Sequence, residues 1–332
     1  MLSPTKYFEL TSGPKDSVSC LEFSPSTLLQ NFLVAGSWDH SVRCWDVEQG
    51  GKTVLKSKQT YKLPVVDVSW SDDGSKVFMA GCDREVKVWD LGSNQTVHIG
   101  AHKASIETCH WFKGSNYSCL MTGSWDKTLK FWDIRSPSPM MSIRLPEYCY
   151  CADVDYPFAV VATAGRKIIV YRLEGKPQQF KTYESQRCEH KCIALFRDEK
   201  QEPAGYALGY AEGRVAIQHL NSSNPSDNFV FKCHSSQPVN NLAFHPVHGT
   251  LATVGFDGAF NFWNKDTRTA LKTNWKALPK QSITRCAFNH DGQIFAYTAD
   301  DKWSMEDGYS TEKKKQYLFL RSCKGELKST TS

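Results

Sequence analysis

One short pattern recurs along the chain and constrains its fold more than any other feature. Each copy begins at a glycine, continues through an aspartate and ends at a tryptophan that Asp or Asn follows. The aspartate stands six residues before the tryptophan in every copy. The four clear copies span 36–46, 81–90, 123–133 and 255–264. Self-similarity at a fixed spacing predicts a fold built from repeated units.

Weaker copies fill the gap in this series. Trp45, Trp89 and Trp132 are 44 and 43 residues apart, whereas 131 residues separate Trp132 from Trp263. That interval has room for two further units, and degenerate copies occur at 165–171 and 212–218. A last strand-like run at 316–321 brings the number of units to seven.

A period of 40–45 residues with a Gly, Asp and Trp-Asp signature is typical of the WD-repeat β-propeller. Apolar residues alternate within the copies, as strands with two distinct faces require. We therefore predict an all-β fold, a single seven-bladed WD-repeat β-propeller over residues 1–322, followed by a polar C-terminal tail at 323–332.

The ends of the chain must close such a ring, because an open blade would expose strand edges. Residues 6–10 (Lys-Tyr-Phe-Glu-Leu) read as a short strand before the first full repeat. We predict that this strand is the outer strand of the last blade, whose other strands come from about 281–321.

Composition and charge narrow the class of protein further. The 332 residues hold 40 Lys and Arg against 35 Asp and Glu, and the whole surplus of five positive charges lies in residues 259–332. No apolar run approaches the ~20 residues that cross a bilayer. Twelve cysteines occur without any Cys-x-x-Cys pair, which favours a reducing compartment and no metal centre. We expect a soluble, intracellular, monomeric propeller without cofactors.

The repeated polar residues could be read as catalytic, and we reject that interpretation. In one repeat His102 precedes Trp132 by 30 residues, with Ser124 and Asp126 between them. Such a set can satisfy buried polar groups at a blade turn, and it recurs once per blade, unlike an active site. We therefore assign structural roles to Asp39, Asp83, His102, Asp126 and Asp257, and we predict that the chain is not an enzyme.

One cluster has the residue types of a metal site. Cys188, His190 and Cys192 would lie on one face of a strand and could bind zinc with a fourth ligand. The run continues as Ile-Ala-Leu-Phe, as in an inner strand with buried alternate positions. We favour burial over metal binding.

Whole segments outside the repeat signature resemble one family, the nuclear-pore mRNA export factors of the WD-repeat class. The matching stretches are 34–38, 70–78, 116–132, 145–153 and 244–255. The resemblance implies a non-enzymatic adaptor of the nucleus and nuclear pore that shuttles to the cytoplasm. Members of this family hold a segment of a Phe-Gly-rich nucleoporin across one propeller face, support mRNA export and have roles at the mitotic spindle.

The resemblance also implies a groove for acidic peptides and RNA, at positions that correspond here to Arg214, Phe231, Trp263 and Arg268. Arginine pairs with carboxylate or phosphate, and exposed aromatics anchor interfaces or stack on bases. Lys265 and Lys272 add charge to the same region.

Two residues at this groove differ from the family. Asn264 stands where Asp is usual, and Ala270 stands where Lys is usual. The lost cation at 270 predicts weaker binding of acidic peptides or RNA, as in a diverged paralogue.

Two other classes of propeller are alternatives to the export family. The related spindle-checkpoint propellers share the Gly-Ser-Trp-Asp-Lys-Thr blade and bind similar peptide motifs in kinases, although segments 148–153 and 246–249 favour the export family. A substrate receptor of a ubiquitin ligase would need a ligase-docking segment, and we find none in the sequence.

Overall fold

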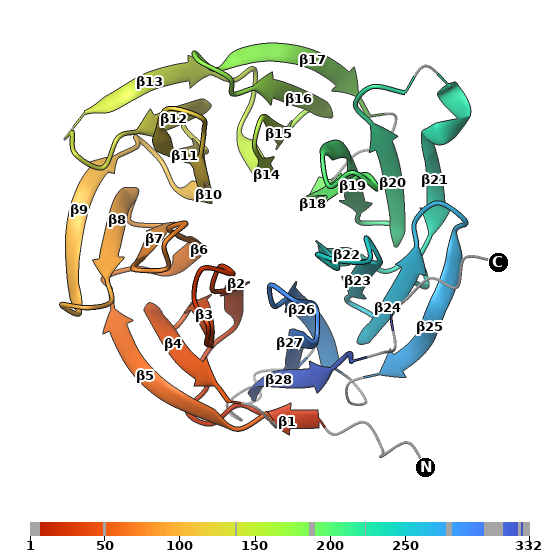
Figure 1. Ribbon diagram of the computed structural model, residues 1–332, viewed down its shortest axis with the longest axis horizontal. Helices are drawn as coiled ribbons and strands as arrows, with labels where there is room; N and C mark the ends of the chain where they lie inside the picture. Colours follow the sequence, from red (N-terminus) through yellow and green to blue (C-terminus); the bar gives the residue numbers. More distant parts are fainter. Residues whose placement is uncertain are drawn as a thin grey trace, which may run out of the picture.

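The computed structural model describes residues 7–48, 51–136, 138–185, 190–222, 224–276, 281–301, 315–324 and 327, without the side chains of Tyr7 and of residues 272–276. These residues form seven antiparallel sheets of four strands each, arranged as blades around a central channel (Figure 1). The predicted seven-bladed, all-β propeller is confirmed.

Blades 1 to 6 each use four consecutive strands, from the channel to the rim. Blades 1 to 3 are β2 (Val18–Phe23), β3 (Asn31–Ser37), β4 (Ser41–Val47) and β5 (Thr53–Thr60); β6 (Val65–Trp70), β7 (Lys76–Gly81), β8 (Glu85–Asp90) and β9 (Gln95–Ala101); β10 (Ile106–Lys113), β11 (Ser118–Ser124), β12 (Thr128–Trp132) and β13 (Pro139–Arg144). Blades 4 to 6 are β14 (Cys149–Asp155), β15 (Phe158–Thr163), β16 (Lys167–Arg172) and β17 (Gln178–Glu184); β18 (His190–Arg197), β19 (Pro203–Tyr210), β20 (Arg214–His219) and β21 (Phe229–Lys232); β22 (Val239–Phe244), β23 (Leu251–Gly255), β24 (Ala259–Asn264) and β25 (Thr269–Lys276). A single 3-10 turn, η1 (Pro225–Asp227), lies between β20 and β21 in the described part of the chain.

Blade 7 joins the two ends of the chain. Its strands are β26 (Gln281–Phe288), β27 (Ile294–Asp301), β28 (Gln316–Ser322) and, at the rim, β1 (Tyr7–Glu9). β1 pairs antiparallel with β28, with Phe8 opposite Leu320, and the Leu10 N–H donates to the Leu318 carbonyl at 2.8 Å. The predicted closure of the ring by the N-terminal strand is confirmed.

The inner strands share a break in register near their start. It falls between Val18 and Cys20 in β2, between Val65 and Asp67 in β6, and at corresponding places in the five other inner strands. A bulge of this kind redirects the side chains that follow it. Polar side chains at and after the break thereby line the channel.

Apolar side chains pack between neighbouring blades. Trp45, Trp89 and Trp132 are at most 1% exposed and lie in three different interblade clusters. The blades approach closely enough that a Cβ added to Gly123 would lie 2.5 Å from the Cys149 Sγ of the next blade. Close packing between sheets, rather than within one, therefore holds the ring together.

Packing continues beyond residue 322, where the sequence pattern places the end of the propeller. Cys323 and Leu327 are buried in the cluster that blades 6 and 7 share. The Thr250 hydroxyl donates to the Leu327 carbonyl at 2.9 Å. Two apolar residues in a polar segment were too weak a signal to extend the boundary.

None of the described segments is a helix that could cross a membrane.

The closure makes the first residues essential for stability. Deleting residues 1–12 removes β1 and the buried Leu10, and we expect it to cost at least ~3 kcal/mol of unfolding free energy, since losing one large core side chain alone costs about that much. Chemical unfolding measures the change, with a deletion of residues 1–5, which leaves β1 intact, as the control. Equal midpoints for the long deletion and the control would contradict the role of β1.

Candidate interaction groove between blades 5 and 6

Three of the four predicted groove residues lie in one continuous row at the rim of blades 5 and 6. The Phe231 ring on β21 meets the Trp263 indole on β24 edge to face, with centroids 5.3 Å apart. Phe229 extends the row, 6.0 Å from Phe231. The Arg268 guanidinium, in the turn between β24 and β25, lies 3.9 Å from the Phe229 ring centroid. Phe229 was not among the predicted residues.

Strand periodicity explains how β21 presents these rings. Phe229 and Phe231 alternate with Val230 and Lys232, so both rings face the neighbouring blade while the other two side chains face outward. Both rings are half-buried against the cluster between blades 5 and 6. The alternation Phe-Val-Phe was the available sequence signal for Phe229.

Trp263 is hydrogen-bonded within its own blade and is also partly exposed. Its indole N–H donates to Thr253 Oγ1 at 3.1 Å, as Trp132 donates to Thr122 Oγ1 at 2.8 Å. Trp132 is fully buried, whereas Trp263 is half-exposed. The tryptophan of blade 6 therefore keeps its bond to the blade and still offers ring surface to the groove.

Asn264 shapes the turn that carries Arg268. Its side-chain oxygen accepts the N–H groups of Asp266 and Thr267 at 2.9 and 3.1 Å, which is the bonding of an Asx turn. Asparagine thus keeps the turn that an aspartate would form and removes one negative charge. Ala270, opposite Trp263 on β25, is exposed.

The remaining cations differ in availability. Arg214 begins β20 opposite Lys232, next to Phe231 on the ladder, and pairs with no acid in the described residues. It lies three residues along the strand from the rung that holds Phe229, ~10 Å away. Lys265 is ion-paired with Asp266 at 2.6 Å, and the Lys272 side chain lies outside the described part. Arg214 shares a face of the sheet with Lys232, whereas the Phe231 ring lies on the other face, so only Arg268 lies at an end of the row.

A second exposed surface lies on the end of the propeller where the inner strands begin. Trp38 and Trp125 occupy equivalent turns there, and Trp125 is 48% exposed and 6.4 Å from Tyr148. The Lys127 ammonium lies 4.9 Å from the Tyr148 ring. Sequence reasoning assigned both tryptophans to the repeat signature alone and so missed their exposure.

The predicted structural residues form polar sets at the blade turns. His102 Nδ1 lies 3.0 Å from Asp126, and its Nε2 lies 2.8 Å from Thr122, which also accepts the Trp132 indole. Blade 6 repeats the set with Asp257 as the carboxylate. Burial lowers the pKa of His102 to about 4, so the ring is neutral at physiological pH.

Blades 1 and 2 replace the histidine with a cation on the same blade. Arg43 pairs with Asp39 at 2.9 Å, and Lys87 pairs with Asp83. Burial opposes ionisation of Asp39, but bonds from Arg43 and from the Lys15 N–H outweigh it and lower the pKa of Asp39 to about 2. The predicted Asp positions thus recur at the turns, with different partners.

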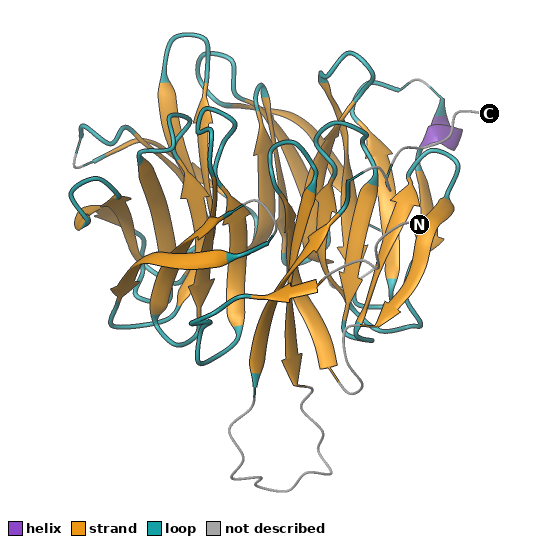
Figure 2. Ribbon diagram, turned by 60° about the horizontal axis from the view of Figure 1, so that its bottom comes forward, coloured by secondary structure: helices purple, strands orange, loops and turns teal. Residues whose placement is uncertain are grey.

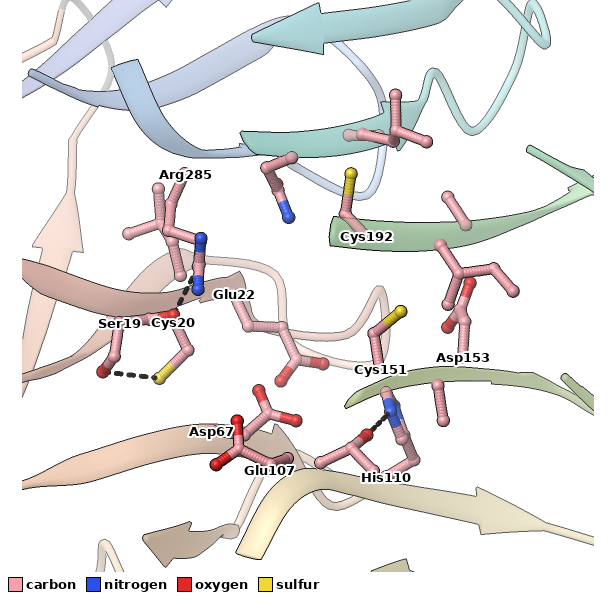
Figure 3. A pocket seen from close by; sticks show the side chains of 18 of the residues that line it. Ser19, Cys20, Glu22, Asp67, Glu107, His110, Cys151, Asp153, Cys192 and Arg285 are labelled. Atoms are coloured by element: carbon pink, nitrogen blue, oxygen red, sulfur yellow. Dashed lines mark hydrogen bonds between the residues drawn. The ribbon is translucent and has the colours of Figure 1, made fainter. Parts of the chain in front are cut away.

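The channel has a polar cavity of about 450 Å³. Figure 3 shows the carboxylates of Glu22, Asp67 and Glu107 converging in it. Asp67 Oδ2 accepts the Cys109 N–H of the next blade at 2.7 Å, and Asp153 accepts the Leu195 N–H at 2.7 Å. These acids therefore tie neighbouring inner strands together.

Among the residues that the structure describes, the channel shows neither an activated thiol nor a metal centre. Burial raises the pKa of the thiols of Cys20, Cys151 and Cys192, so they stay protonated and unreactive. Cys188 lies outside the described residues, and the Cys192 thiol donates to the Val239 carbonyl. No three Cys, His, Asp or Glu side chains in the described ranges are placed to hold a metal ion.

Seven four-stranded blades, of which blades 3 and 6 carry the full set of Asp, His, Thr and Trp at their turns, define a WD-repeat propeller, a class whose surfaces bind other macromolecules. Comparison with known proteins agrees. The WD domain, G-beta repeat matches residues 5–46, 53–90, 93–133 and 226–264. The chain is 59% identical to Protein Rae1 of Drosophila melanogaster, over 97% of this chain and 95% of that protein.

Vertebrate proteins are nearly as similar. The proteins named mRNA export factor from Danio rerio and Xenopus tropicalis are 56% and 55% identical, over 98% of this chain and 92% of each relative. The chain belongs to the family of WD-repeat mRNA export factors.

The channel acids make stability depend on pH. Burial raises the pKa of Asp67 to about 6, and it also raises the pKa of Asp153 in blade 4 to about 6. Because the folded state holds this proton more tightly than the unfolded state, the resulting stabilisation is complete below about pH 4. It is lost as the pH rises from about 4 through 6. Asp67→Asn removes this loss, so we expect its stability relative to wild type to increase by about 2–3 kcal/mol between about pH 4 and pH 7.5.

Urea unfolding at a series of pH values measures the difference, with Asp198→Asn at an exposed turn as the control. Parallel pH profiles for wild type and Asp67→Asn would show that this carboxylate does not titrate in that window.

Proposed function

We propose that this chain is a non-enzymatic adaptor of mRNA export, which binds a segment of a Phe-Gly-rich nucleoporin at the nuclear pore through the groove of blades 5 and 6. The observation that carries the binding site is the half-exposed row Phe229, Phe231 and Trp263 with the Arg268 guanidinium at its end. The export role rests on relatives at 55–59% identity that are named Rae1 or mRNA export factor.

The groove suits a peptide that carries both apolar and acidic side chains. Half-buried aromatic rings offer large contact area at little cost in conformational entropy. Arg268 is exposed and stacked on Phe229, so its planar group is held in place and its N–H edge stays free for a carboxylate.

The same groups suit RNA as a second ligand. Bases stack on exposed aromatic rings, and arginine pairs with phosphate. Five surplus positive charges in residues 259–332 favour an anionic partner near blades 6 and 7.

We place the protein in the nucleus and at the nuclear envelope, with passage to the cytoplasm. A role at the mitotic spindle would use the same peptide surface.

The chemistry of the polar groups supports a non-enzymatic role. The acids at the blade turns are saturated with partners such as Arg43 and His102. The channel thiols are protonated. Neither set leaves a nucleophile beside a base in the arrangement that catalysis requires.

Charge reversal at Arg268 tests the groove. We expect Arg268→Glu to weaken binding of the nucleoporin segment by at least about tenfold, because an anchoring arginine at the end of an aromatic row becomes a repelling carboxylate. Isothermal titration measures the affinity, and Lys58→Glu on the rim of blade 1 serves as the control. Equal affinities for wild type and Arg268→Glu would place the peptide elsewhere.

A spindle-kinase peptide titrated in the same experiment separates the two families. Binding of the kinase peptide with none of the nucleoporin segment would favour a spindle-checkpoint propeller.

Restoring the missing cation should strengthen binding. Ala270 is exposed and opposite Trp263, so Ala270→Lys places an ammonium beside the aromatic row. We expect about threefold to tenfold tighter binding of the nucleoporin segment and of single-stranded RNA, with a steeper salt dependence for RNA. Unchanged affinity for both ligands would remove residue 270 from the groove.

A further inference from the structure

A second cavity lies at the rim between blades 3 and 4. It measures about 470 Å³, within the range of sites that bind ligands. Phe131 and Cys119, both buried, form its floor, while Met140 and Met141 on β13 form one wall. Met140 is 52% exposed, so the wall is open to solvent.

The opposite wall comes from blade 4. Lys176 and Pro177, in the turn between β16 and β17, line it. Tyr117 closes one side, and its hydroxyl donates to the Leu173 carbonyl of blade 4. Two blades therefore border the cavity, and this hydrogen bond joins them.

The cavity repeats the geometry of the groove between blades 5 and 6. Met141 lies opposite Phe131 on its sheet, as Phe229 lies opposite Ile217 on the sheet of blade 5. In both places the outer strand of one blade meets the turn before the outer strand of the next. That turn carries one cation, Lys176 here and Arg268 in the groove.

Charge selects the kind of ligand. Lys176 is exposed and forms no ion pair with any described residue, because the nearby Glu174 pairs with Arg172 at 2.6 Å. It is the charged member of a lining that is otherwise apolar or neutral. An apolar cavity with one free cation at its rim fits a ligand that has a bulky apolar group next to a carboxylate.

The edge of the sheet favours a peptide over a lipid. β13 is the outermost strand of blade 3, and no described strand pairs with its free side. Such an edge offers backbone N–H and C=O groups to an extended chain, which a fatty acid cannot use. Methionine walls also adapt to side chains of different shape.

We propose that the cavity between blades 3 and 4 is a second peptide-docking site. An extended acidic segment of a partner protein places a Leu or Phe side chain against Met140 and Met141, and its carboxylate pairs with Lys176. This site is separate from the groove and does not depend on the nucleoporin proposal.

Methionine methyl NMR on the full chain tests the proposal. The probe is the capped peptide Gly-Asp-Glu-Leu-Phe-Asp-Glu-Gly, and a peptide with Asn and Gln in place of its acids is the control. With protein labelled at the methionine methyl carbon, we expect saturable shifts of Met140 and Met141 at about 1 mM peptide, while the methyl of Met79, buried between blades 1 and 2, stays in place.

Two variants of residues that line the cavity localise the effect. Lys176→Glu should weaken binding about three- to fivefold, the upper range of one exposed ion pair, and should abolish the preference for the acidic over the neutral peptide. Pro177→Trp, in the blade 4 turn that lines the cavity, should block binding. Lys58→Glu and Arg268→Glu should leave the Met140 and Met141 shifts intact, which separates this site from the groove.

Three outcomes would overturn the proposal. They are unmoved Met140 and Met141 methyls, shifts that survive both Lys176→Glu and Pro177→Trp in folded protein, and equally strong shifts with decanoate. The last result would assign the cavity to lipid carboxylates, because decanoate has the apolar body and the charge without a backbone.

Discussion

The pairing of β1 with β28 is the interaction on which the rest of the molecule depends. Six blades form from consecutive strands, but the seventh needs residues from both ends of the chain. Without it, β28 would lose its outer neighbour and the cluster that contains Leu10, Leu318 and Leu320 would open. Because each blade lies between two neighbours in the ring (Figure 1), loosening one contact weakens the geometry of the whole ring. Figure 2 turns the side of the ring that holds blade 7 toward the viewer.

The closed ring separates two chemical environments. Toward the channel, acids such as Asp67 accept backbone N–H groups from the adjacent blade and so serve the fold. At the rim, outer strands meet the turns of the next blade and leave aromatic or thioether groups half-exposed beside a cation. Both binding sites that we propose therefore lie at junctions between blades, where neither blade alone presents the surface.

The sequence predicted the repeated blades, the polar residues at their turns and the strand that closes the ring. The spacing of Asp126 and Trp132 sufficed for the blade turns, and the apolar pattern of residues 6–10 sufficed for the closing strand. The stacking of Arg268 on Phe229 could not be read in the same way, since it depends on how two blades pack. The pattern that signals a repeat also concealed the exposure of Trp125.

Substitutions relative to the family acquire a physical meaning only in three dimensions. Asn264 keeps the turn bonding of an aspartate, so it changes charge without changing shape. Ala270 leaves the face beside Trp263 without an ammonium group. Both positions lie beside the aromatic row and bear on its charge rather than on its shape.

A crystal structure of this chain with the nucleoporin segment would show directly whether the groove is the binding site. We expect an apolar side chain of the segment against Phe231 and Trp263 and a carboxylate within hydrogen-bond distance of the Arg268 guanidinium. A segment bound wholly on another part of the propeller, with Arg268 free, would contradict this expectation.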